Sequence, residues 1–153
     1  MGNRAVIAFV DNNQPKPEVA VYMHWNGGPE SVYAILDVMK EKRGFCHSAA
    51  YSTARFAHLA CALVGHDGHS VGIEAVRGLT VMAGMGEDNG LYLVNVSDQS
   101  VERYTLKRES GRVCKASAGA VDAERIACLS HKYWVDDAIR NKLRAACAEE
   151  VSA

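Results

Sequence analysis

The sequence lacks the patterns that mark several large classes of protein. Its five cysteines stand far apart with no Cys-x-x-Cys pair, which excludes a zinc knuckle and a thioredoxin-like redox site. We find no signal peptide and no apolar run of membrane-spanning length, so we expect a cytosolic protein with reduced thiols. The net charge of −1 gives no overall basic field for nucleic acid or an anionic membrane. A polyanionic ligand would therefore need a local cluster of arginines and amides.

The common catalytic motifs are also missing. The chain has no Gly-x-Ser-x-Gly elbow, no phosphate-binding lysine loop and no Gly-x-Gly-x-x-Gly between a strand and a helix. We therefore expect a binding protein with no catalytic residue and no cofactor. One alternative is a metal-dependent phosphohydrolase that uses His66, Asp67 and His69. The same stretch is typical of an ordinary turn and no second cluster completes a ligand set, so we expect no metal.

Hydrophobic periodicity predicts an α+β fold. We predict strands over residues 4–10, 19–24, 70–76, 79–83, 91–96 and 101–107, and helices over residues 29–42 and 48–64. The expected architecture is an antiparallel sheet with two consecutive helices packed on one face and a helical C-terminal tail. Residues 1–110 would form the ligand-binding core, with residues 109–120 as a linker or loop and residues 111–153 as linker and tail.

The predicted tail carries apolar side chains without an obvious partner in the core. They are Tyr133, Trp134, Ile139 and Leu143. We expect part of this surface to be buried against another chain, which makes the protein at least a dimer. The alternative is that the tail packs over its own sheet.

A strand runs directly into a helix near residue 25. Pro29 suits the first position of a helix, while Gly27 and Gly28 permit positive φ and close approach to the backbone. The first amides of the helix favour an anion. His24, Trp25 and Asn26 stand at this corner and are candidate ligand-binding residues. The alternative is a tight turn with Trp25 in the core.

Four further residues are candidates for binding. Asp88 and Asn89 lie in an Asp-Asn-Gly turn, where an amide can donate and accept hydrogen bonds and a positive φ is favoured. Arg55 shares one face of the second helix with Tyr51 and His58, and Arg103 lies inside the last strand; a planar guanidinium suits a phosphate. We expect Arg55 and Asn89 to be partly exposed at a pocket. The alternatives are a simple turn and surface arginines.

Four segments together resemble a known family. They are Gly2-Asn-Arg-Ala-Val-Ile7, Tyr22-Met-His-Trp-Asn-Gly-Gly28, Tyr51-x-x-Ala-Arg-Phe56 and Asp88-Asn-Gly-Leu-Tyr-Leu-Val94. This combination resembles small phage and prophage proteins of the pattern GNRAVI…YLHWNGG…DNGxYVV, a group that includes the phage anti-Thoeris sponge proteins. The resemblance covers residues 2–106 and leaves the tail outside.

The resemblance implies a protein that sequesters an immune signal without cleaving it. Such sponges capture the cyclic ADP-ribose isomer made by a defence TIR protein, form dimers and sometimes hexamers, and in some cases hold cyclic oligonucleotides. Arg55, Asn89 and Arg103 match positions of the signal pocket. The candidate ligand-binding residues are thus His24, Trp25, Asn26, Arg55, Asp88, Asn89 and Arg103. The competing hypothesis is a protein-binding inhibitor or adaptor of a mobile element, with Trp25 and the tail as interface anchors.

Overall fold

The computed structural model of the chain describes residues 2–41, 45, 48–64, 70–107, 110–116 and 141–145. Its elements are β1 (Ala5–Val10), β2 (Val19–Met23), α1 (Pro29–Glu41), α2 (Ala49–Val64), β3 (Val71–Ala75), α3 (Leu79–Met85), β4 (Leu91–Asn95), β5 (Ser100–Lys107) and β6 (Arg112–Ala116). Residues 141–145 are also helical. The predicted α+β class is confirmed. No helix within the described residues combines the length and apolarity needed to cross a bilayer.

The strands form one sheet with the order β3-β2-β1-β4-β5-β6. Neighbouring strands are antiparallel except at the centre, where β1 and β4 run parallel with Val6 opposite Leu91. The prediction of a wholly antiparallel sheet is therefore wrong at this one pair. Periodicity identifies a strand but not its partner, which explains the error. All six residues of β1 are buried, as expected for a central strand covered on both faces.

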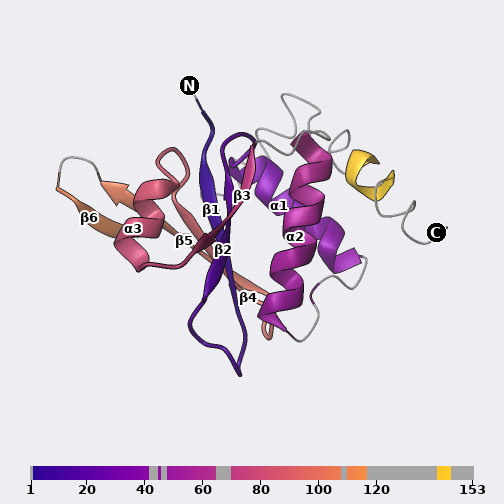
Figure 1. Cartoon of the computed structure of the whole chain (residues 1–153), viewed down its shortest axis with the longest axis horizontal. Helices are drawn as coiled ribbons and strands as arrows, with labels where there is room; N and C mark the ends of the chain where they lie inside the picture. Colours follow the sequence, from indigo (N-terminus) through magenta and orange to yellow (C-terminus); the bar gives the residue numbers. More distant parts are fainter. Residues whose placement is uncertain are drawn as a thin grey trace.

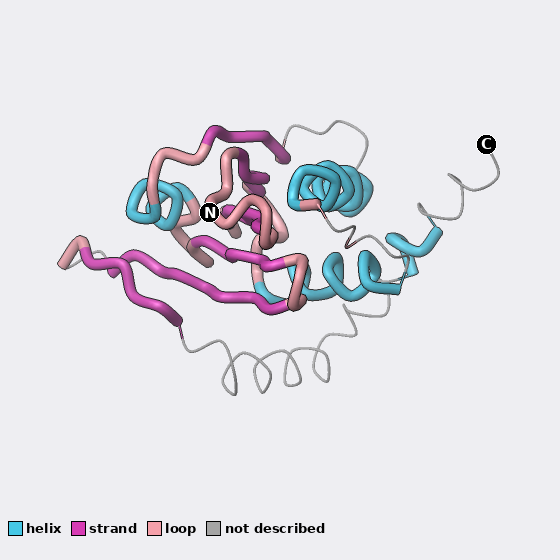
Figure 2. Tube along the Cα trace, turned by 90° about the horizontal axis from the view of Figure 1, so that it is seen from below, coloured by secondary structure: helices cyan, strands magenta, loops and turns pink. Residues whose placement is uncertain are grey.

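Helices cover both faces of the sheet (Figure 1 and Figure 2). The larger core joins α1 and α2 to one face through residues that include Phe9, Ile35 and Phe56. This confirms the prediction that these two consecutive helices pack on the same face. The smaller core lies on the other face, where α3 buries Met82 and Ala83 against β1 and β4.

Two predicted elements are wrong. Residues 79–83 were expected to form a strand but belong to α3, because a short apolar run does not distinguish a strand from a buried helix. Residues 109–120 were expected to be a linker, yet Arg112–Ala116 forms β6 and pairs with β5. Gly111 has a φ of 61° in the turn between these strands, a conformation that glycine adopts without strain. The boundary expected near residue 110 therefore falls inside a hairpin.

The described end of the tail packs on its own chain. Leu143 is fully buried in the larger core. The Lys142 ammonium donates to the Leu63 carbonyl at 2.7 Å, and Arg144 makes hydrogen bonds of 3.0 and 2.8 Å to the Glu41 carboxylate. Leu143 therefore does not belong to the part of the tail surface that was expected to face another chain. Tyr133, Trp134 and Ile139 lie outside the described residues.

Candidate functional site

Three segments meet at the edge of the sheet where β1 and β4 begin. Asn3 connects them, because its backbone N–H donates to the His24 carbonyl at 3.1 Å and its carbonyl accepts from Gly27 at 2.7 Å. Its side-chain oxygen accepts a hydrogen bond from the Asn89 amide. The N-terminal segment thus lies between the β2–α1 corner and the turn before β4. Sequence reasoning missed Asn3, although it lies in the first segment that carries the family resemblance.

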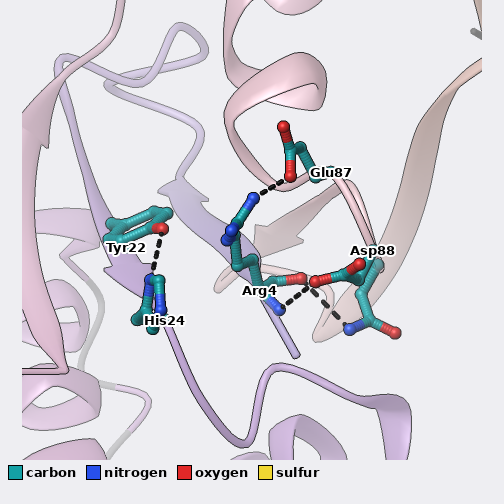
Figure 3. Close-up of polar contacts among 6 residues, drawn as sticks. Arg4, Tyr22, His24, Glu87 and Asp88 are labelled. Carbon is teal, nitrogen blue, oxygen red and sulfur yellow. Dashed lines mark hydrogen bonds and ion pairs between the residues drawn. The ribbon is translucent and has the colours of Figure 1, made fainter. Parts of the chain in front are cut away.

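Arg4 is the accessible cation of this edge. Its guanidinium forms an ion pair with Glu87, and its backbone N–H donates to the Asp88 carboxylate at 3.0 Å (Figure 3). The side chain is 30% exposed, while its Nε atom is buried without a hydrogen-bond partner among the described residues. Sequence reasoning missed Arg4 as well, since a residue at the start of a strand has no periodic signal of its own.

Asn89 and Arg103 contact each other and are both buried. The Arg103 Nε donates to the Asn89 carbonyl at 2.8 Å, and the guanidinium lies 5.3 Å from the centre of the Tyr92 ring. Only 7% of Asn89 and 6% of Arg103 is exposed. The expectation that Asn89 is partly exposed is therefore wrong, because its amide donates to Asn3 and to the Arg4 carbonyl. The pair stabilises the turn from within.

The backbone of this turn also differs from expectation. The positive φ expected at Asn89 occurs instead at Glu87 (21°) and Gly90 (77°). A Cβ atom on Gly90 would collide with the Tyr104 carbonyl of β5, so this position requires glycine. The carboxylate of Glu87 is consequently displayed from a turn that neighbouring strands hold in place.

The β2–α1 corner depends on close packing against β1. Positive φ occurs at Asn26 (58°) and not at Gly27 or Gly28, which the sequence allowed to adopt it. A Cβ atom on Gly27 would lie 2.6 Å from the Ala5 nitrogen, so close approach is what requires this glycine. The Glu30 carboxylate lies against Gly28 at the start of α1. This acidic group already complements the helix dipole that was expected to attract an anion.

His24 and Trp25 present rings at the same corner. Trp25 is 44% exposed, so the alternative that it belongs to the core is wrong. His24 meets the Trp25 indole edge-on with ring centres 5.2 Å apart, and its Nδ1 lies 3.1 Å from the Tyr22 hydroxyl. Figure 3 shows the Tyr22–His24 pair on one side of Arg4 and the acidic turn on the other. The rings of His24 and Trp25, the guanidinium of Arg4 and the carboxylates of the turn before β4 thus lie at the same end of the sheet.

Arg55 lies apart from this edge. It is exposed on the outer face of α2 together with Tyr51 and His58, which confirms that these three side chains share a face. The inner face of α2 packs on β1, β2 and β3. Asn3 links the corner that carries His24, Trp25 and Asn26 to the turn that carries Asp88 and Asn89. Arg103 contacts Asn89 from β5, and Arg55 lies elsewhere.

The α3 face of the sheet contains a separate apolar pocket of about 270 Å³. Ala8, Leu79, Met82 and Leu93 contribute to its lining, and Lys16 is the one charged residue among the described residues that line it. Its lining lacks the convergent polar groups that orient a polar ligand. The edge around Arg4 is the better candidate for an anionic ligand.

His66, Asp67 and His69 lie outside the described residues. Within the described part of the chain, no group of three or more His, Cys, Asp or Glu side chains is arranged to hold a metal ion. Comparison with known proteins finds no matching family model, no matching curated protein and no matching solved structure.

Proposed function

We propose that this chain is a non-catalytic binding protein that captures a phosphate-bearing nucleotide of the cyclic ADP-ribose type and releases it unchanged. The observation that supports it is the convergence of an accessible guanidinium, Arg4, with the rings of His24 and Trp25 at one braced edge. The ligand class follows from the resemblance of residues 2–106 to the phage anti-Thoeris sponges. As in that group, the chain would act in a bacterial host and assemble at least as a dimer.

Each group at the edge has a distinct role in this proposal. Arg4 donates hydrogen bonds to a phosphate, since a guanidinium matches phosphate geometry. The half-exposed Trp25 packs against the base or ribose, an environment that suits its large apolar surface. Asn89 and Arg103 hold the turn and do not contact the ligand, because both side chains are buried. Sequestration also requires slow release, so that the protein outcompetes an effector for a scarce signal.

Substitution at Arg4 tests the site. We expect Arg4→Ala to weaken the binding of cyclic ADP-ribose about ten- to hundredfold, measured by calorimetry, because a charge-assisted hydrogen bond contributes roughly 1.5–3 kcal/mol. Arg55→Ala removes the same charge from the exposed face of α2 and serves as the matched control. If Arg55→Ala loses binding while Arg4→Ala retains it, the pocket lies on α2.

The fate of the ligand tests the absence of catalysis. The protein is incubated with cyclic ADP-ribose and denatured by heat, and the released compounds are identified by mass spectrometry. We expect the intact ligand. A cleaved product would mean an enzyme, and a wild-type protein that binds neither cyclic ADP-ribose nor ADP-ribose would overturn the proposal as a whole.

A further inference from the structure

The anion-binding group of the proposed site already has an anionic partner. The Arg4 guanidinium pairs with the Glu87 carboxylate, and the two side chains are 30% and 44% exposed. Both groups are therefore accessible to solvent, and the carboxylate can turn away without opening the core. The pairing is incomplete, because the buried Nε of Arg4 has no hydrogen-bond partner among the described residues.

The backbone directs Glu87 toward Arg4. Glu87 has a φ of 21°, in a region that non-glycine residues rarely adopt. The turn keeps this conformation because the Asp88 carboxylate accepts from the Arg4 backbone at 3.0 Å and the Asn89 N–H donates to the Arg4 carbonyl at 3.1 Å. Arg4 thus supplies the guanidinium and also anchors the turn that carries Glu87, the counter-ion of this guanidinium. A carboxylate tethered in this way has a high effective concentration at Arg4.

We propose that Glu87 is a resident counter-ion which an anionic ligand must displace from Arg4, so that it lowers the affinity of the site for monophosphate and diphosphate ligands alike. This inference rests on the proposed function. A ligand with one phosphodiester charge exchanges one anion for another and must compete with the tethered carboxylate. It also approaches Asp88, whose negative charge stays beside Arg4. A diphosphate brings a second charge and more acceptor oxygens, so it forms more charge-assisted hydrogen bonds than the carboxylate it replaces.

The test compares two probes of different charge. ADP-ribose carries a diphosphate, and 3′,5′-cyclic AMP carries one phosphodiester charge. We expect the wild-type protein to bind cyclic AMP at least tenfold more weakly than ADP-ribose. Glu87→Gln should raise the affinity for both probes by roughly tenfold, the effect of about one charge-assisted contact, because either ligand must displace the same carboxylate.

The matched control is Glu74→Gln on β3, which removes one partly exposed acid and its ion pair with Arg77. It should leave both affinities unchanged, which separates a local effect from the change in net charge. If Glu87→Gln does not fold, Glu87→Asp shortens the side chain and is expected to raise both affinities in the same way. Unchanged affinities for both probes in a folded Glu87 variant overturn the inference, while wild-type binding of ADP-ribose upholds the proposed function. Loss of wild-type binding to both probes overturns both.

Discussion

At the scale of the residue, chemical type was easier to predict than exposure. Asn89 and Arg103 were selected because an amide and a guanidinium can bind a nucleotide, and they do lie at the candidate site. Their burial depends on partners that the sequence does not identify. Arg103, for example, is paired with Tyr92 on the neighbouring strand β4. Arg4 had no signal in its own neighbourhood, because its importance comes from contact with a turn more than eighty residues later.

Burial changes what a substitution at Asn89 does. Asn89→Ala should lower the free energy of unfolding by about 1–3 kcal/mol, because it leaves the partly buried amide oxygen of Asn3 and the buried guanidinium of Arg103 without this partner. Urea unfolding measures this loss as a lower midpoint with an unchanged slope. Asn12→Ala, at an exposed position, should stay within about 0.5 kcal/mol of the wild type. Equal midpoints for the two variants would contradict the bracing role.

At the scale of the element, long amphipathic segments were predicted well and short ones were not. The bounds of α1 and α2 agree with the sequence because each helix has a sustained apolar stripe. The helix α3 has too few residues to establish a hydrophobic periodicity. The strand β6 lies at the edge of the sheet and contains polar residues. Whether such segments form a helix, strand or loop depends on what they pack against, so tertiary contacts decided both cases.

The start of α2 is capped from a distant part of the chain. The Asp11 carboxylate accepts from the Ala49 N–H at 2.8 Å and from the Gln14 N–H at 2.6 Å. These hydrogen bonds lower the pKa of Asp11 below its usual 3.8, and the bond from Ala49 contributes most to this shift. Their contribution to stability is therefore present above pH 3.8 and is lost as the pH falls through the lowered pKa of the folded state.

Asp11→Ala should accordingly lower the melting temperature at neutral pH and flatten its decline on acidification. The measurement is thermal unfolding followed by circular dichroism from neutral pH to below 3.8. Asp11→Asn keeps a hydrogen-bond acceptor without the charge, so it should recover part of the neutral stability and remain equally insensitive to acid. A wild-type acid dependence in both variants would rule out this cap as its source.

At the scale of the whole molecule, the arrangement of the tail decides between two roles for Leu143. This side chain is fully buried within its own chain, beside the ion pair of Arg144 with Glu41. Leu143→Ala should therefore lower the free energy of unfolding by about 2–5 kcal/mol without changing the mass measured by light scattering. Ala145→Ser, at an exposed position of the same turn, is the control and should be nearly neutral. Unchanged stability with a smaller assembly would restore the tail as an interface between chains.

The parallel pairing of β1 with β4 also determines the order in which the molecule can be completed during synthesis. β1 leaves the ribosome before β4 and can pair early with β2. Val6 can pair on its other side only after Leu91 of β4 has been synthesised. Contacts between such distant residues form slowly because a long loop must close first. The turn that holds Arg4 precedes β4 directly. The candidate binding edge is therefore assembled late, and a nascent chain that does not yet include β4 cannot capture a ligand there.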